Sequence, residues 1–174
     1  MAEIRKLGRK TDHRLAMLKN LTTSVIWHGQ IETTEAKAKE VKSIVDSLIS
    51  LAIKEKDNYE MVEETVSLAK VDEKGKKVTE TVTSKNGKTY NRVVRENVTR
   101  TVKKDNPSRL AARKKLMANL NKVKDAKGNN VDLPGKMFGE IAEKYADRKG
   151  GYTRIIKLGQ RRGDAAEAVI LQLV

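Results

Sequence analysis

Cysteine is absent from this sequence and aromatic side chains are few. Without Cys, the 174 residues can form neither disulfide bonds nor thiolate metal sites. Trp, Tyr and Phe make up 3% of the chain, so the core must be built from Leu, Ile, Val, Ala and Met, with little bulk for a large ligand pocket. No apolar run approaches membrane-spanning length, and the basic first twenty residues lack the apolar middle of a secretory signal. We therefore expect a cytoplasmic protein.

The charge balance is strongly positive. The chain has 37 Lys and Arg against 23 Asp and Glu, a formal net charge of +14. Such an excess indicates a polyanionic partner, with nucleic acid as the first candidate. An anionic membrane is the second, but the sequence has no basic amphipathic helix with exposed Trp or Phe. Neither a small-molecule substrate nor a cofactor is indicated.

Basic residues concentrate in three stretches, which helices packed on a small sheet could bring to one side. Their Arg and Lys donors would grip phosphates rather than read base edges, and the shape of folded RNA would supply specificity. The first stretch alone is equally compatible with a floppy terminus, and the third alone with a solvated surface strand between ordinary loops. The candidate RNA-binding residues are Arg5, Lys6, Arg9, Lys10, His13, Arg14, Lys19 and Asn20 in the first; Arg109, Arg113 and Lys114 in the second; and Arg148, Lys149, Tyr152, Arg154, Lys157, Arg161 and Arg162 in the third.

The third stretch, residues 148–163, has six basic residues and no acid. Glycines bracket an alternating run, which predicts a short strand between two flexible basic loops. Such a strand can bury Ile155 while the guanidinium of Arg154 stays outside. The ring of Tyr152 could stack on a base, but packing is an equal alternative beside Gly150-Gly151.

Four helices are predicted from apolar spacing. The first begins at Thr11 or Asp12 and ends near Gly29; the second follows a cap at Thr33 or Thr34; the third starts at Asn106-Pro107; the fourth follows Pro134. The inward residues expected are Leu15, Leu18, Leu21 or Thr22 and Val25; Ala38, Val41, Val45, Leu48, Ile49 and Ala52; Leu110, Met117 and Leu120; and Met137, Phe138, Ile141, Ala142 and Tyr145. The lysines of the second helix alternate with acids, which favours a solvated face with local ion pairs.

Strand patterns accompany these helices. Residues 30–34 are short and β-branched, and residues 168–174 form a nearly all-apolar run, expected as a central strand with a docked end. Between them, residues 64–68, 77–83, 89–95 and 97–102 alternate polar with β-branched side chains, and Asn86-Gly87 is a two-residue hairpin signal. This insertion could instead be partly disordered until it meets a neighbour, because it has few large apolar residues.

The predicted fold class is α+β, with helices packed on a small mixed β-sheet and an inserted antiparallel β-hairpin or sheet subdomain. The core domain comprises residues 1–54, with the basic arm, and residues 107–174, with the C-terminal strands. The β-rich insertion comprises residues 55–106 and has a net charge of only +3 over residues 59–105, so it need not lie flat on RNA. A role as an adaptor for another protein is also compatible.

Three groups of residues resemble one family. They are Ile31-Glu32-Thr33-Thr34-Glu35-Ala36-Lys37-Ala38-Lys39 with Asp46-Ser47-Leu48-Ile49; His13-Arg14 with Asn20; and Gly150-Gly151-Tyr152-Thr153-Arg154-Ile155 with Arg162-Gly163-Asp164. Together they resemble the bacterial ribosomal large-subunit protein seventeen family. The resemblance implies an α+β structural protein of the ribosome that binds large-subunit rRNA, contacts neighbouring large-subunit proteins and aids subunit assembly near the polypeptide exit side. The roughly fifty residues between Lys54 and Pro107 depart from it, because the family is expected to have a short loop there.

Catalysis has little support in the sequence. There is no phosphate-cradling glycine loop with Lys-Ser/Thr, no Ser-x-Gly elbow and no His-carboxylate spacing of a metallohydrolase. The two histidines, His13 and His28, have no Cys partner, so we expect no metal site. The alternative to a ribosomal role is a free-standing basic nucleic-acid-binding module, nucleoid- or transcription-associated. Such factors usually carry a dimerisation face or a helix-turn-helix reader, and neither is evident.

Overall fold

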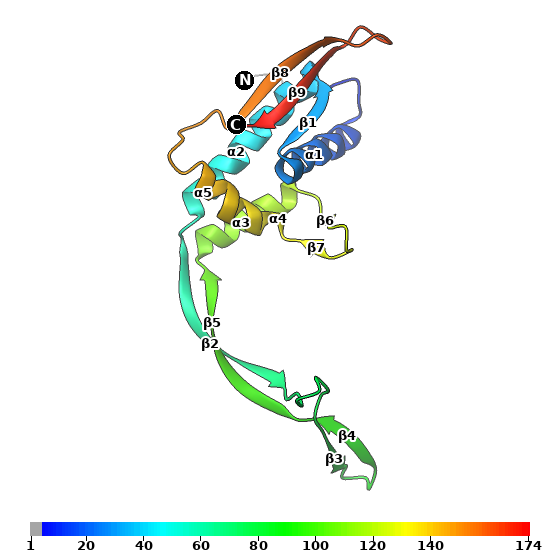
Figure 1. Cartoon of the computed structure of the whole chain (residues 1–174), viewed down its shortest axis with the longest axis vertical. Helices are drawn as coiled ribbons and strands as arrows, with labels where there is room; N and C mark the ends of the chain where they lie inside the picture. Colours follow the sequence, from blue (N-terminus) through cyan, green and yellow to red (C-terminus); the bar gives the residue numbers. More distant parts are fainter. Residues whose placement is uncertain (1–4) are drawn as a thin grey trace. The chain divides into compact units, whose positions relative to one another are not determined.

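A computed structural model describes residues 5–174 of the chain. It divides into two compact units (Figure 1). One contains the described residues up to Asn58 together with Asn106–Val174, and we call it the helix–sheet unit. The other is Tyr59–Asp105, which we call the β-ribbon unit.

The sheet of the helix–sheet unit has three strands. They are β1 (Gln30–Thr34), β8 (Thr153–Gln160) and β9 (Glu167–Leu173), in the order β1-β9-β8. Both pairings are antiparallel, so the α+β prediction is confirmed but the expectation of a mixed sheet is wrong. The apolar run at the end of the chain supplies the central strand β9, as predicted, and its Val169 and Leu171 are fully buried.

The last residues are docked, also as predicted. The Leu173 amide donates to the Gly29 carbonyl at 2.8 Å, and the Val174 amide donates to the Tyr152 carbonyl at 3.0 Å. The hydroxyl of Tyr145 donates to the Val174 carbonyl at 2.6 Å. These bonds fasten the end of the chain to three other elements of the unit.

Helix α1 (Thr11–His28) ends where the sequence predicts. Gly29 adopts the left-handed conformation with φ 81°, and its amide donates to the Val25 carbonyl. Leu18, Thr22, Val25 and Ile26 are buried. The prediction that Leu15 faces inward is wrong: its side chain is 57% exposed, because it lines an open hollow between α1 and the end of the third helix.

Helix α2 (Glu35–Glu55) packs on the sheet and on α1. Its buried residues are the six that the spacing predicts: Ala38, Val41, Val45, Leu48, Ile49 and Ala52. Thr34 is the N-cap residue, although its side chain makes no capping hydrogen bond. Midway along the helix, Asp46 Oδ1 accepts a 3.0 Å hydrogen bond from the Thr153 hydroxyl at the start of β8. This bond fixes β8 alongside α2.

Helix α3 (Pro107–Asn119) begins with Pro107 at its first turn, as predicted, but buries a different face. Leu110 and Met117 are exposed, whereas Ala112, Leu116 and Leu120 are buried together with Arg109. The Asn106 side chain does not cap the helix and instead donates to Asn58 Oδ1 at 2.9 Å. On this buried face the Arg109 guanidinium lies over the Phe138 ring, 4.7 Å from its centroid.

A small hairpin and a helical segment follow α3. Strands β6 (Val123–Lys124) and β7 (Asn130–Val131) pair antiparallel around a turn in which the Gly128 amide donates to the Asp125 carbonyl. The segment runs through α4 (Leu133–Lys136), the π-helical turn η1 (Met137–Ile141) and α5 (Ala142–Lys144). Asp132 caps it by accepting from the Gly135 amide at 3.1 Å. The five residues predicted to face inward are all buried: Met137, Phe138, Ile141, Ala142 and Tyr145.

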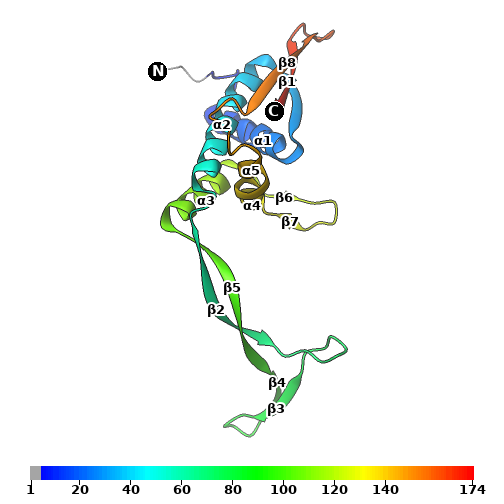
Figure 2. The ribbon, with the colours of Figure 1, turned by 60° about the vertical axis from the view of Figure 1, so that its left-hand side comes forward.

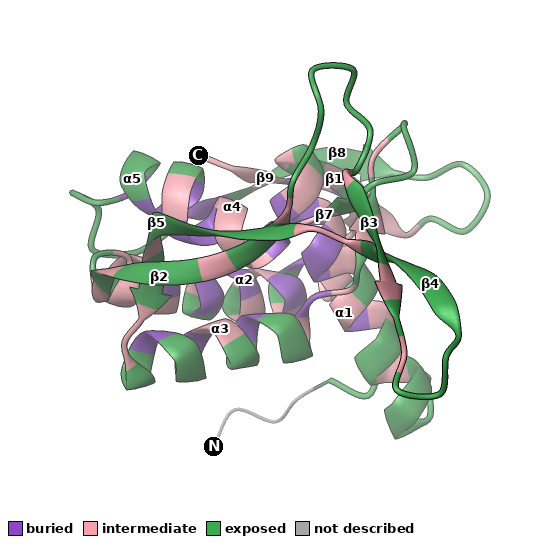
Figure 3. Cartoon of the chain, turned by 90° about the horizontal axis from the view of Figure 1, so that it is seen from below, coloured by how far each residue is buried: buried purple, intermediate pink, exposed green. Residues whose placement is uncertain are grey.

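The β-ribbon unit has the antiparallel strands that the sequence predicts (Figure 2). Strand β2 (Tyr59–Ala69) pairs along its length with β5 (Arg95–Asp105), and β3 (Thr79–Thr83) pairs with β4 (Thr89–Val93). None of these strands has a buried residue (Figure 3). The sequence predicts a two-residue loop at Asn86-Gly87, and this length is wrong. Residues 84–88 form the loop, because the Gly87 amide donates to the Ser84 carbonyl and closes a four-residue turn that ends at Gly87.

Candidate nucleic-acid interface

The basic arm is folded into a turn before α1. The Arg9 amide donates to the Lys6 carbonyl at 3.1 Å, and Leu7 and Gly8 have φ 53° and 64°. Leu7 packs against the core, whereas the side chains around it stay exposed. The exposed basic residues of the arm are Arg5, Lys6, Arg9 and Lys10.

The first turns of α1 continue this basic surface. His13 and Asn20 are exposed, and Arg14 and Lys19 are half-buried. The carboxamide oxygen of Asn20 accepts from the Asn121 side chain, just after α3. The Asn121 amide also donates to the Thr23 hydroxyl at 3.0 Å. These contacts place the C-terminal end of α3 beside α1.

Two acids on α2 gather basic groups from three elements. Glu40 Oε1 lies 3.7 Å from Arg5 Nε of the arm. Glu35 Oε1 lies 2.9 Å from Lys39 Nζ, one turn along α2, and 3.7 Å from Lys157 Nζ on β8. The N-terminal half of α2 is therefore where the arm and β8 meet.

The electrostatics of Glu35 agree with this geometry. The bond from Lys39 is the largest cause that lowers the pKa of the Glu35 carboxyl below its usual value of 4.5, and the charge of Lys157 adds to it. The carboxylate is consequently ionised at neutral pH and holds both ammonium groups near one another. The i,i+4 pair of Glu35 and Lys39 is the local pairing that the charge pattern of α2 predicts.

Strand β8 carries the predicted cationic edge. Arg154 is exposed and Ile155 is partly buried against the core, as expected. Lys157 has a side chain that is 66% exposed. The register with β9 shifts between Lys157 and Gly159, so a bulge interrupts the regular alternation of faces there. Arg148 and Lys149 are exposed in the loop before β8.

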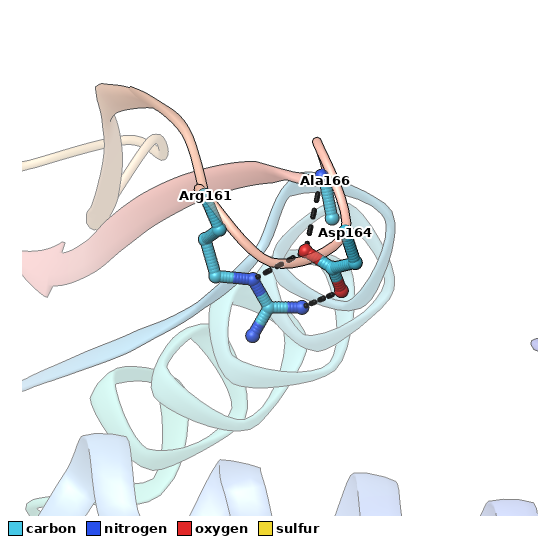
Figure 4. A network of polar contacts seen from close by, with 3 residues as sticks. All are labelled: Arg161, Asp164 and Ala166. Atoms are coloured by element: carbon cyan, nitrogen blue, oxygen red, sulfur yellow. Dashed lines mark hydrogen bonds and ion pairs between the residues drawn. The ribbon is translucent and has the colours of Figure 1, made fainter.

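The loop after β8 is held by one carboxylate (Figure 4). Asp164 accepts hydrogen bonds from Arg161 at 3.2 and 2.7 Å and from the Ala166 amide at 3.2 Å. The Ala166 bond is the largest cause that lowers the pKa of the Asp164 carboxyl, and Arg161 lowers it further. The guanidinium of Arg161 is thereby fixed in direction, while Arg162 beside it is exposed.

Two predicted site residues face the interior. Arg109 is only 7% exposed and Tyr152 only 4%. The Tyr152 ring packs edge-on against Tyr145, with centroids 5.5 Å apart, and its hydroxyl donates to the Arg148 carbonyl at 3.1 Å. Of the two roles weighed for Tyr152, the structure favours packing over base stacking. Arg109 belongs to the core contact with Phe138.

The other predicted residues of α3 differ from each other. Arg113 is partly buried, with its guanidinium 5.4 Å from the Phe138 centroid and 3.8 Å from Asp132 Oδ2. Lys114 is exposed and faces solvent, as does Lys115 beside it. The role of Glu35 and Glu40 was missed by sequence reasoning. The only local sign of it is the Glu35–Lys39 spacing, since Lys157 is distant in sequence.

No group of three or more His, Cys, Asp and Glu able to hold a metal ion occurs among residues 5–174. Within the same residues, no helix combines the length and apolar character needed to cross a bilayer.

Comparison with known proteins identifies the family. The family model described as ribosomal protein L17 matches residues 17–174. The chain belongs to the ribosomal protein L17 family. Proteins named large ribosomal subunit protein bL17 are similar to it along nearly their whole length: the one from Acetivibrio thermocellus is 56% identical, and the one from Ruminiclostridium cellulolyticum 60%, each covering 98% of both chains. The bL17 of Staphylococcus aureus strain Newman is 37% identical with the same coverage.

Membership in the L17 family confirms the resemblance carried by the outer motifs. The family is one of structural, non-enzymatic ribosomal proteins, which confirms that the chain is not an enzyme. The matched range also runs across the β-ribbon unit, residues 59–105.

Proposed function

We propose that this L17-family chain is a structural constituent of the bacterial large ribosomal subunit that binds rRNA through the helix–sheet unit. The main support for this interface is that the basic arm and strand β8 both contact the N-terminal half of α2. Arg5 and Lys157, from opposite ends of the sequence, lie within 3.7 Å of acids only five residues apart on that helix. A single cationic surface can therefore be presented to RNA by separate elements.

The surface suits phosphate binding. Its exposed donors lie on rigid elements: the first turns of α1, strand β8 and the fixed loop of Arg161. Each phosphate neutralised by Lys or Arg releases counterions, so affinity falls steeply as salt rises. Such contacts position the protein on folded RNA without reading base edges. RNA shape then supplies the specificity.

The partners in this proposal are large-subunit rRNA and neighbouring large-subunit ribosomal proteins. The place is the ribosome in the cytoplasm, on the polypeptide exit side, where the chain contributes to subunit assembly. The resemblance of the outer motifs supports these finer assignments, and membership in the L17 family agrees with them.

Sedimentation of a native lysate through a sucrose gradient at moderate salt tests this proposal. We expect the chain to migrate with the large subunit in a one-to-one ratio with other ribosomal proteins. Recovery in light or DNA-containing fractions instead would overturn the proposal and favour a free-standing nucleic-acid-binding module. A variant with Arg154→Gln and Arg162→Gln should occupy the subunit less fully at raised salt, whereas the matched variant with Lys144→Gln and Lys127→Gln, outside the proposed surface, should not.

A further inference from the structure

The β-ribbon unit ends in a fork. The ladder of β2 and β5 ends at Ala69 and Arg95. Beyond it the Lys70 amide donates to the Val94 carbonyl, the Val94 amide to Val78, and the Val78 amide to Lys70, all at 2.9 to 3.0 Å. Three chain segments meet in this ring of bonds, and two hairpins leave it (Figures 1 and 2). We call residues 70–94 the forked tip and the β2–β5 ladder the stem.

Both hairpins of the tip close with the same turn. The Asp72 amide donates to Lys76 and the Ser84 amide to Lys88, at 2.8 and 2.7 Å. Gly75 and Gly87 each have φ 75°, and their amides donate back to Asp72 and Ser84 at 2.9 Å. A lysine directly follows the glycine in both turns. The two prongs thus present ammonium groups on loops of one fixed geometry.

Charge is divided unevenly between tip and stem. The tip has seven Lys and Arg and three Asp and Glu, a net charge of +4. The stem, residues 59–69 and 95–105, has four basic and five acidic residues, a net charge of −1. No Lys or Arg of the tip is within ion-pair distance of a carboxylate among the residues that the structure describes. The tip therefore keeps a net positive charge, even with Glu80 opposite Arg92 in the β3–β4 register, and this charge suits a polyanionic partner.

An aromatic ring stands among these charges. Tyr90 is 52% exposed on β4. Because side chains alternate along a strand, Tyr90 and Arg92 share one face of β4, and Lys88 directly precedes the strand. An exposed aromatic between two cations is the arrangement that stacks an unpaired base while holding its flanking phosphates.

We propose that the forked tip is an RNA-binding site separate from the helix–sheet surface. It contacts the phosphates of an unpaired rRNA segment through Lys76, Lys88 and Arg92, and stacks one base on Tyr90. The near-neutral stem takes no part in this contact. The assignment of the RNA as ribosomal rests on the proposed function.

Cross-linking within intact subunits tests the site. A photo-reactive amino acid is placed at Asn86, at the end of one prong, and in a second strain at Ser67, on the stem. Both side chains are exposed. Irradiation of purified large subunits should cross-link position 86 to rRNA and give no cross-link to rRNA from position 67. Cross-links from position 86 only to protein, none at all, or equal RNA cross-links from both positions would overturn the proposal.

Binding of the purified full-length chain to purified large-subunit rRNA separates the tip from a general charge effect. In the variant K76Q/K88Q, the slope of the logarithm of the association constant against the logarithm of the salt concentration should be smaller in magnitude by about 1.4, as expected for two single-stranded phosphates. The variant R100Q/K104Q removes equal charge from the stem and should leave the slope unchanged. Equal slopes for both variants would contradict the site. This result stands even if the chain proves absent from large subunits, which would refute only the ribosomal assignment.

Substitution of Tyr90 tests the stacking. Tyr90→Ala should weaken rRNA binding by about 5- to 150-fold, the usual range for loss of one stacked base, and Tyr90→Phe should restore it. Circular dichroism of each variant confirms that the strands remain. Unchanged affinity of Tyr90→Ala would remove the stacking contact from the proposal.

Discussion

The hydroxyl of Ser108, in the first turn of α3, donates a 2.9 Å hydrogen bond to Oε2 of Glu55, the last residue of α2. The same oxygen accepts from Asn58 Nδ2 at 2.8 Å. The Asn106 amide donates to the Asn58 carbonyl at 3.3 Å. The two chain segments that flank residues 59–105 are therefore joined within the helix–sheet unit by one carboxylate and its partners.

This carboxylate should make stability depend on acid pH. Its bonds from Asn58, and then from Ser108, lower the pKa of Glu55 below its usual value of 4.5. A lowered pKa means that the ionised form contributes stability above the unfolded pKa, and that this contribution is lost as pH falls through the folded one. Glu55→Gln should thus be less stable than the native chain in urea at about pH 7, and the difference should shrink as the pH falls below 4.5. A difference that does not change with pH would contradict this account.

The docked end of the chain should depend on Tyr145. Removing its hydroxyl in Tyr145→Phe leaves the Val174 carbonyl without that donor while the ring remains packed. We expect a loss of about 1 kcal/mol in the free energy of unfolding, measured by urea denaturation. Tyr90→Phe, which removes a hydroxyl from an exposed ring, is the control and should change it by less than about 0.5 kcal/mol.

Substitutions of Arg109 and Lys114 should distinguish a residue that stabilises the fold from one that binds RNA. Arg109→Gln removes the buried guanidinium over Phe138 and should lower the free energy of unfolding by about 1 to 2 kcal/mol. Lys114→Gln removes the same charge from an exposed position on α3. It should leave stability unchanged and reduce the salt dependence of rRNA binding. The reverse pattern would show that α3 turns its other face to RNA.

Glu35 should lower the affinity of the cationic surface for RNA. Glu35→Gln removes the charge that holds Lys39 and Lys157, so both ammonium groups become available to phosphates. We expect rRNA affinity to rise several-fold at low salt and the gain to shrink as salt screens the charges. Glu143→Gln makes the same charge change at an exposed position of α5. An equal gain in that variant would attribute the effect to net charge alone.

The sequence predicts the buried residues best where a helix has a single apolar stripe that repeats along its length. Helix α2 packs on both the sheet and α1, so its apolar stripe has to repeat along most of its length, and all six expected residues are buried. The same holds for Phe138 and Tyr145 in the segment after Pro134. In such cases the period alone determines which face turns inward.

Helix α3 shows where that reasoning fails. Its sequence offers apolar residues on two faces, and the face that is buried carries Leu116 together with Arg109, whose guanidinium lies over Phe138. A guanidinium that packs over an aromatic ring can be buried, but from the sequence alone an Arg is expected to be exposed. The sequence alone therefore predicts Arg109 to be an RNA-binding residue.

The candidate site was only partly visible for a related reason. The three basic stretches can be found by counting charge, and most of their side chains are exposed. Their grouping around Glu35 depends on a contact with Lys157, more than a hundred residues away, for which no local pattern exists. Tyr152 and Tyr90 make the same point: sequence does not tell a packed ring from an exposed one.

The position of β9 has a consequence for the order of folding. During synthesis, β1 and α1 emerge first and β9 after every other strand, yet β9 lies between β1 and β8. Until it arrives, β1 has no neighbour in the sheet, and the apolar face of α2 has no completed layer to cover it. The three-stranded sheet can therefore be completed only through the long-range pairing of β1 with β9, which joins segments more than a hundred residues apart and should slow the folding of this unit.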